Sequence, residues 1–253
     1  MFFRQLFLLF MIAALITSAV PYEASCETQI EFLNGLTLTS KHWSRTGKNF
    51  RVNLTLPWLM PESDERARKF NDSIVKFTKK TSSIFEEWPD DPAEPRRSAC
   101  AKDYVKCDFE VVSATDQFIS IVIHIDSYGW PAMHPLSETE VINYSLKNCA
   151  KIELADLFIP SSDYLTTISN YCLTQLRKKP NIIQVLNEEW IKDGTMPRFE
   201  NFADWNIDKD GLIFTFGEYQ VAAYAAGISK VIVPYSALAH IVRRDRRMPE
   251  SGN

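Results

Sequence analysis

The sequence predicts an α+β fold with two lobes. Apolar residues at every second position, the spacing of strands, dominate the first half and flank one long stretch with helical spacing. Two helical stretches and a hairpin follow. A chain of 253 residues, 45% hydrophobic, can build one large core or two modest ones. We therefore expect a small antiparallel sheet with a long amphipathic helix over residues 28–147, then a helix-rich lobe with a hairpin and a final strand over residues 148–242.

Residues 1–19 have the order of an export signal. One positive side chain, Arg4, precedes an apolar block from Leu6 to Ile16, and small residues follow it up to Ala19. The block is short for a membrane span, which needs about 20 apolar residues. We expect cleavage after Ala19 and a periplasmic or extracellular protein. An uncleaved membrane anchor is the alternative.

The five cysteines fit an oxidising compartment and leave one over. Cys26, just past the predicted signal, is the lipidation candidate, although Glu23 stands where a bacterial lipoprotein normally has an aliphatic residue. Among the three pairings open to the other four, we favour Cys100 with Cys107 and Cys149 with Cys172. No cysteine and histidine spacing typical of zinc is present in the sequence. We expect neither a metal nor another cofactor.

The first lobe reads as strands around one helix. Period-two alternation predicts strands over residues 50–58, 105–111, 118–126 and 139–146. Pro57 indicates that the first of them ends at a sheet edge. Between the first two, apolar residues at three- and four-residue steps predict a helix from Pro61 to Trp88, with Ser63 or Asp64 near its start.

The polar face of the strand over residues 118–126 carries Ser120, His124 and Asp126. His124 and Asp126 lie two apart on that face and have the residue types of a metal site or a catalytic pair. Polar side chains on a sheet are far more often solvated, and we expect these three to face water.

The loop from Ser127 to Leu136 carries the ligand-binding candidates, Tyr128, Trp130 and His134. One glycine and two prolines make this loop rigid. Large rings on a rigid loop suit recognition, because they offer much contact area for little lost entropy. Plugging the end of a core is the alternative role for the same rings.

The second lobe is expected to open at Pro160 with a helix, which Pro180 ends before a further helical stretch. The dipeptide at residues 210–211 predicts a hairpin. A short apolar strand follows, and Pro234 with Tyr235 opens a last helical turn. Residues 243–253 form a basic tail that we expect to be solvated. A net charge of -4 offers no broad basic field, so nucleic acid is not an expected partner.

The stretch from Glu218 to Tyr235 resembles the C-terminal signature of an extracytoplasmic module. That module occurs in the outer part of the RsiV anti-sigma factor, the bacterial receptor for lysozyme, and beside peptidoglycan deacetylases of the PdaC type. The family pattern is a tyrosine- and alanine-rich crossing to a glycine, then Val-x-Ile-Pro-Tyr; here Ala223 stands where proline is frequent and Val233 replaces isoleucine. A loop ending in His-Pro and an acidic-Leu-Phe step at residues 156–158 match the preceding part of the pattern. The resemblance implies an α+β fold in two parts.

The same resemblance limits the expected function. Anti-sigma factors of the RsiV type need a cytosolic domain, and only three residues precede Arg4. Deacetylases of the PdaC type carry their metal chemistry in a separate domain with an Asp-Asp and His-x-x-x-His arrangement, which His42, His124, His134 and His240 do not provide. We therefore expect an exported module, more a binding protein than an enzyme and without an assignable catalytic residue, that binds a wall glycan or a protein such as lysozyme.

Two other functions stay open. One is an envelope-glycan hydrolase or deacetylase that uses surface carboxylates such as Glu188 with Glu189 or Asp208 with Asp210. The other is a structural lipoprotein. In each case we expect contact with a membrane only through a lipid on Cys26 or an uncleaved signal.

Overall fold

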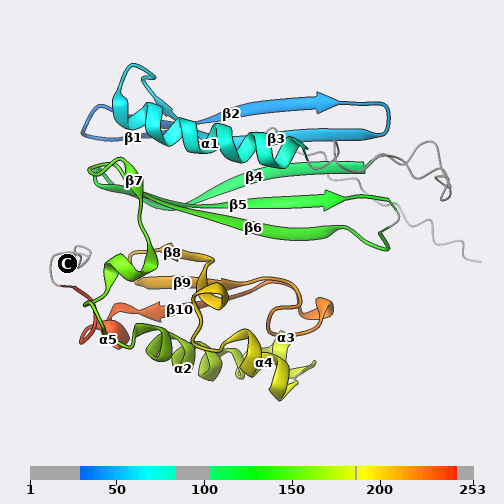
Figure 1. Ribbon diagram of the computed structural model, residues 1–253, viewed down its shortest axis with the longest axis vertical. Helices are drawn as coiled ribbons and strands as arrows, with labels where there is room; N and C mark the ends of the chain where they lie inside the picture. The colour runs from blue at the N-terminus through cyan, green and yellow to red at the C-terminus, as the bar shows by residue number, and fades with distance from the viewer. Residues whose placement is uncertain (1–28, 84–102, 131, 186, 244–253) are drawn as a thin grey trace, which may run out of the picture.

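A computed structural model describes residues 29–83, 103–130, 132–185 and 187–243 (Figure 1). The predicted signal, Cys26, Cys100 and the tail from residue 244 lie outside the described residues. None of the helices in those four ranges has the length and apolar character needed to cross a membrane.

The first half forms a seven-stranded mixed sheet in which strand order follows the sequence. The strands are β1 (Ile30–Glu31), β2 (Thr37–Thr46), β3 (Phe50–Met60), β4 (Asp103–Ala114), β5 (Phe118–Tyr128), β6 (Leu136–Ser145) and β7 (Ala150–Lys151). Neighbours pair antiparallel except β3 and β4, which run parallel over Phe50–Leu54. The prediction of a small antiparallel sheet is therefore wrong in size and in strand direction. Periodicity does not reveal β2, because Leu38 and Trp43 are its only large apolar residues.

The parallel pair requires a crossover, and α1 (Glu65–Ser83) lies within it. The predicted helix is confirmed over Glu65–Ser83, and its predicted part from residue 84 to Trp88 lies outside the described residues. Asp64 lies at its start, as predicted, and Asp64 Oδ1 accepts a hydrogen bond from the backbone N–H of Arg66 at 2.8 Å. The Arg66 guanidinium donates to the same carboxylate and lowers the pKa of Asp64 to about 2. The helix buries Phe70 and Ile74 against the sheet, in the first of two hydrophobic cores.

An asparagine of α1 completes the sheet where β4 stops pairing. The β3–β4 register ends at Leu54, so the rest of β3 pairs with β2 alone. Asn71, which is buried, accepts from the backbone N–H of Leu59 and donates to its carbonyl, both at 2.9 Å. It replaces the missing strand neighbour and satisfies backbone groups that would otherwise be buried without partners. Pro57 lies in this half-paired stretch, although β3 is not an edge strand.

The second half packs helices on a three-stranded antiparallel sheet of order β10-β9-β8. Its elements are η1 (Leu154–Leu157), α2 (Tyr164–Leu176), α3 (Pro180–Ile183), α4 (Glu188–Gly194), η2 (Phe199–Phe202), β8 (Trp205–Ile207), β9 (Gly211–Phe216), η3 (Tyr224–Ala226), β10 (Ser229–Pro234) and α5 (Tyr235–Leu238). The predicted hairpin is confirmed, because Asp208 N–H donates to the Gly211 carbonyl at 3.0 Å across the turn. Phe202, Phe214 and Phe216 centre the second hydrophobic core.

A buried polar seam joins the two sheets, and we define it as Ser120, Asn143 and Asn206. Ser120 Oγ donates to Asn143 Oδ1 at 2.7 Å and accepts from the Ile207 backbone N–H at 2.9 Å. Asn143 Nδ2 donates to the Trp205 carbonyl at 2.7 Å, and Asn206 Nδ2 reaches back to Ser120 Oγ at 3.1 Å. All three side chains are at most 2% exposed. The expectation that Ser120 faces water is wrong, because β8 covers that face of β5.

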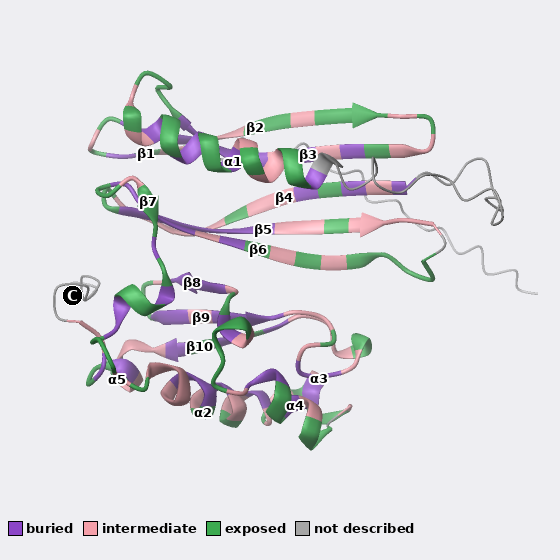
Figure 2. Ribbon diagram, in the orientation of Figure 1, coloured by how far each residue is buried: buried purple, intermediate pink, exposed green. Residues whose placement is uncertain are grey.

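Burial decreases along β5 and β6 toward their connecting loop (Figure 2). The seam lies in the buried part of these strands, whereas His124 is 42% exposed at its side chain and Asp126 is exposed. Phe118 of β5 belongs to the second core, while Ile119, Ile121 and Ile123 belong to the first. One strand thus contributes to both cores. The division into lobes at residues 147 and 148 stays a prediction.

The cysteines of the described ranges are free thiols, which corrects the disulfide prediction. Cys149 and Cys172 are both unpaired, so the predicted bridge between them is wrong. Cys107 is free as well, and its predicted partner, Cys100, is not among the described residues. Burial raises the pKa of the Cys107 thiol and of the Cys172 thiol to about 12 in each case. The two occupy different cores, where a thiol packs as a small apolar side chain.

Candidate functional site

The structure separates the three predicted ligand-binding residues. Tyr128 stacks on Tyr104, with ring centroids 6.2 Å apart. The backbone N–H of Trp130 donates to Asp103 Oδ1 at 2.9 Å, and its indole N–H is buried without a hydrogen bond to any described residue. His134, later in the same loop, instead meets two tyrosines of the second half. The loop therefore contacts two different parts of the fold, and His134 is the candidate that contacts the second half.

His134, Tyr219 and Tyr224 form a three-ring group that we name the aromatic cluster. The rings of His134 and Tyr224 stack at 4.2 Å between centroids, with 28° between their planes. Tyr219 and Tyr224 stack at 5.7 Å and 30°. The hydroxyl of Tyr219 lies 3.5 Å from His134 Nε2, so each ring contacts the other two. The Tyr219–Tyr224 distance lies within the range typical of attractive aromatic pairs, about 4.5–7 Å, and the His134–Tyr224 distance lies just below it.

The hydrogen bonds of His134 define its tautomer. Nδ1 lies 2.9 Å from the carbonyl oxygen of Pro135, which can only accept, so Nδ1 carries the proton of this bond. In the neutral ring Nε2 is then an acceptor, and it faces the hydroxyl of Tyr219. The cluster thus presents a polar edge formed by a ring nitrogen and a hydroxyl.

The cluster is open to solvent. Tyr219 is 46% exposed and Tyr224 37%, and the neighbouring Met133 is 96% exposed. Large exposed rings grouped on one surface are uncommon away from binding sites, because their apolar area is usually buried. They form a small apolar surface that carries polar atoms.

Neighbouring segments brace the chain that carries both tyrosines. Tyr219 adopts a left-handed backbone conformation, φ +64°, which costs an L residue roughly 1–2 kcal/mol. The indole N–H of Trp190 in α4 donates to the Tyr219 carbonyl at 2.6 Å. Gln220 accepts from Gly217 N–H at 3.1 Å and donates to the Asn201 carbonyl at 2.9 Å. Strained residues held in this way are enriched at binding and catalytic sites.

Gly194 provides the close approach that this bracing needs. A Cβ at position 194 would stand 2.0 Å from the Gln220 carbonyl oxygen, closer than real contacts allow. Only glycine at position 194 allows the end of α4 to lie directly against the backbone of Gln220. The position of the aromatic cluster therefore depends on α4 and η2 as well as on the loop that carries the two tyrosines.

Carboxylates named as alternative catalytic groups lie elsewhere. Glu188 forms an ion pair with Arg177 at 2.6 Å, and Asp210 lies in the β8–β9 turn with its side chain 65% exposed. Asp204, which the sequence does not single out, is half-buried; burial raises its pKa while Thr139 donates to it at 3.3 Å. Within the described ranges, no group of three or more His, Cys, Asp or Glu side chains is placed to hold a metal ion.

Sequence reasoning selects His134 by residue type but does not select its two partners. Tyr219 lies 85 residues further along the chain, and both tyrosines belong to the signature stretch, where they read as part of a family pattern. The available signal was the pair of tyrosines five residues apart beside a glycine. Periodicity alone does not indicate that they meet a histidine from another loop.

The fold and the cluster define a two-sheet α+β module with an exposed aromatic surface. Residues 155–236 match the family described as "Protein of unknown function (DUF3298)". The chain is also 26% identical over 199 residues to the peptidoglycan-N-acetylmuramic acid deacetylase PdaC of Bacillus subtilis (strain 168), which covers 78% of this chain and 40% of that protein. These matches confirm the resemblance drawn from the sequence as a match to DUF3298 and a distant similarity to PdaC. The chain spans well under half the length of that deacetylase.

Two crystal structures of DUF3298 family proteins have the same fold. The protein from Bacteroides fragilis NCTC 9343 superposes with a TM-score of 0.60 at 16% identity, covering 82% of this chain and 94% of the other. The protein from Pseudomonas aeruginosa PAO1 gives 0.51 at 14% identity, covering 83% and 95%. At these identities the likeness concerns the fold alone.

Proposed function

We propose that this protein is an exported, non-catalytic module that binds a glycan of the cell wall through its aromatic cluster. The observation that carries the proposal is the group of three stacked rings, two of them well exposed, with a hydroxyl and a ring nitrogen at one edge. Sugar rings have apolar C–H faces and polar rims. Aromatic faces pack against the former, and Tyr and His groups bond the latter.

Support also comes from the related protein and from the bracing of the site. PdaC bears the name of an enzyme that acts on N-acetylmuramic acid in peptidoglycan. A module related to it that lacks an assigned catalytic set is suited to holding the same polymer. The Trp190 and Gln220 hydrogen bonds fix the cluster before a ligand arrives, which lowers the entropy lost on binding.

The test is co-sedimentation with purified insoluble peptidoglycan. The parent protein is expected to pellet with the polymer, and Tyr224→Ala is expected to weaken binding about tenfold or more, because a central aromatic contact contributes roughly 1.4 kcal/mol or more. Tyr104→Ala is the matched control. It removes a tyrosine that also stacks on another tyrosine, Tyr128, outside the cluster.

Three other outcomes would change the proposed site, the proposed ligand or the proposed non-catalytic role. Loss of binding in Tyr104→Ala but not in Tyr224→Ala would move the site to the other end of the loop, toward Tyr128 and Trp130. Binding of the parent to lysozyme but not to the polymer would replace the glycan with a protein ligand. Release of shortened or deacetylated glycan during the assay would contradict the non-catalytic part.

A further inference from the structure

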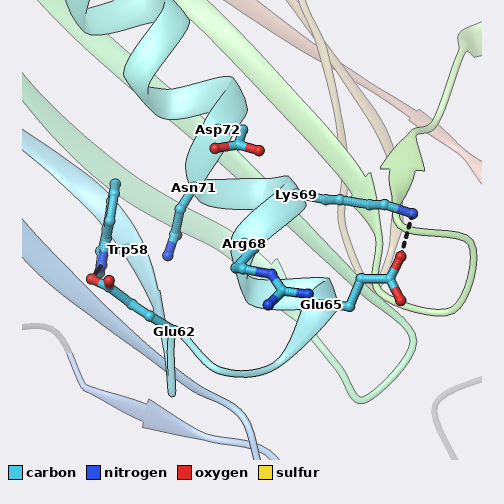
Figure 3. Close-up of a pocket in the computed structure, with 7 residues that line it drawn as sticks. All are labelled: Trp58, Glu62, Glu65, Arg68, Lys69, Asn71 and Asp72. Atoms are coloured by element: carbon cyan, nitrogen blue, oxygen red, sulfur yellow. Dashed lines mark hydrogen bonds and ion pairs between the residues drawn. The ribbon is translucent and has the colours of Figure 1, made fainter.

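A second surface feature, independent of the aromatic cluster, is an open pocket of about 390 Å³ beside the first turns of α1 (Figure 3). Trp58 from the end of β3, Glu62 from the β3–α1 turn, and Arg68 and Asp72 from the helix line it. Its volume falls within the range of small-molecule sites, about 300–1,000 Å³.

Several of the charged groups around the pocket already have partners. The indole N–H of Trp58 donates to Glu62 Oε1 at 2.8 Å. Lys41 Nζ lies 3.7 Å from the centre of the Trp58 ring and 3.8 Å from Glu62 Oε1. Glu65 and Lys69 form an ion pair at 2.8 Å, drawn as a dashed line in Figure 3. These contacts hold Trp58, Glu62, Glu65 and Lys69 in place around the pocket.

Arg68 and Asp72 are the pocket charges outside these contacts, although Arg68, after Lys69, helps to lower the pKa of Glu65. Neither side chain makes a hydrogen bond or an ion pair with another residue of the described ranges, and both are exposed. They are four residues apart and therefore on one face of α1. Figure 3 shows the Arg68 guanidinium between Glu62 and the Glu65–Lys69 pair, with Asp72 on the next turn. A base followed by an acid is the weaker order for such a helical pair, so their mutual attraction is small.

We propose that this pocket binds a small zwitterion, an α-amino acid or a dipeptide, which carries both a carboxylate and an ammonium group. The planar fork of Arg68 matches a carboxylate in bidentate geometry, and the Asp72 carboxylate accepts from the ammonium group. The ring of Trp58 supplies an apolar contact between them. Exposed ion pairs are weak, so the dissociation constant is expected to be on the order of millimolar.

The experiment is an NMR titration that follows the indole N–H of Trp58. Dialanine is expected to shift this signal with saturation, while N-acetyl-dialanine and dialanine amide, each lacking one of the two charges, bind at least about fivefold more weakly. Arg68→Gln and Asp72→Asn are each expected to weaken dialanine binding by a similar factor. Lys230→Gln changes an exposed charge in β10, in the second half of the chain and outside the pocket, and is expected to leave binding unchanged.

Three results would overturn the proposal: no saturable shift of Trp58, equal binding of the blocked peptides, or equal weakening by Lys230→Gln. A double-mutant cycle showing strong coupling between Arg68 and Asp72 in the free protein would also contradict it, because the two charges would then satisfy each other. The titration is independent of the proposed glycan site. Tyr224→Ala is expected to leave it unaltered, so either proposal can fail alone.

Discussion

The polar seam and the aromatic cluster each group three side chains that can form hydrogen bonds, but the seam is buried and the cluster is exposed. In the seam, Ser120 and its two asparagine partners are buried, and each side chain bonds to others across the two sheets. In the cluster, Tyr219 and Tyr224 stack on His134 yet keep 46% and 37% of their surface exposed. The buried, mutually hydrogen-bonded side chains of the seam hold the two sheets together, whereas the exposed rings of the cluster are available to a ligand.

The largest expected effect is the loss of the seam. Asn143→Ala removes the acceptor of the Ser120 hydroxyl and the donor to the Trp205 carbonyl, leaving buried groups without partners. We expect the free energy of unfolding to fall by roughly 2–5 kcal/mol, because each orphaned buried group costs about 1–3 kcal/mol. Chemical denaturation measures this change. Unchanged stability would contradict the structural role of the seam. A loss of glycan binding in the folded variant would contradict the assignment of binding to the aromatic cluster alone.

The next largest effect is expected from removing Asn71, the residue of α1 that replaces a missing strand neighbour of β3. Asn71→Ala leaves the N–H and carbonyl of Leu59 unpaired, and we expect the free energy of unfolding to fall by roughly 2–3 kcal/mol. Hydrogen exchange at Leu59 is expected to speed up locally. Asp72→Asn, one residue further along the same helix but exposed, serves as the control and is expected to change stability by less than about 0.5 kcal/mol.

A third prediction concerns pH and the buried thiols. Burial raises the pKa of Cys172 from 9.0 to about 12, so the folded state keeps the proton after the unfolded chain has lost it. The unfolded state then binds fewer protons, and stability falls as the pH rises from about 9 to about 12, by about 1.4 kcal/mol per pH unit for each thiol. Below pH 9 this contribution is fully present. Unfolding curves of the parent and Cys172→Ala measure the difference in slope, and an unchanged slope would indicate that Cys172 carries no free thiol.

The smallest expected change in stability comes from loosening the cluster. Trp190→Phe removes the hydrogen bond to the Tyr219 carbonyl while keeping an aromatic ring. We expect a stability loss of about 1 kcal/mol, together with a several-fold loss of glycan binding as Tyr219 leaves its fixed conformation. Sedimentation and denaturation of the same variant provide both values. A stability loss without a binding loss would show that the bracing serves folding alone.

Local patterns predict most of the elements and little of how they meet. Alternation identifies β3 to β6, and three- and four-residue spacing identifies α1, because each signal lies within one segment. The same alternation misplaces Ser120, since a polar residue reads as exposed unless one knows that β8 covers it with hydrogen-bonding partners. The cysteine pairing failed for a related reason: spacing along the chain says nothing about Cys172 packing inside the second core. Tyr219 and His134 are brought together only by the tertiary fold.

The most direct test is to observe the rings themselves while a soluble wall-glycan fragment is added. In an NMR titration, the ring signals of His134, Tyr219 and Tyr224 are expected to shift together and saturably, while the side-chain amide signals of Asn143 and Asn206 stay in place. Shifts confined to other surfaces, or no shift at concentrations where the insoluble polymer retains the protein, would contradict the assignment of the cluster as the glycan site.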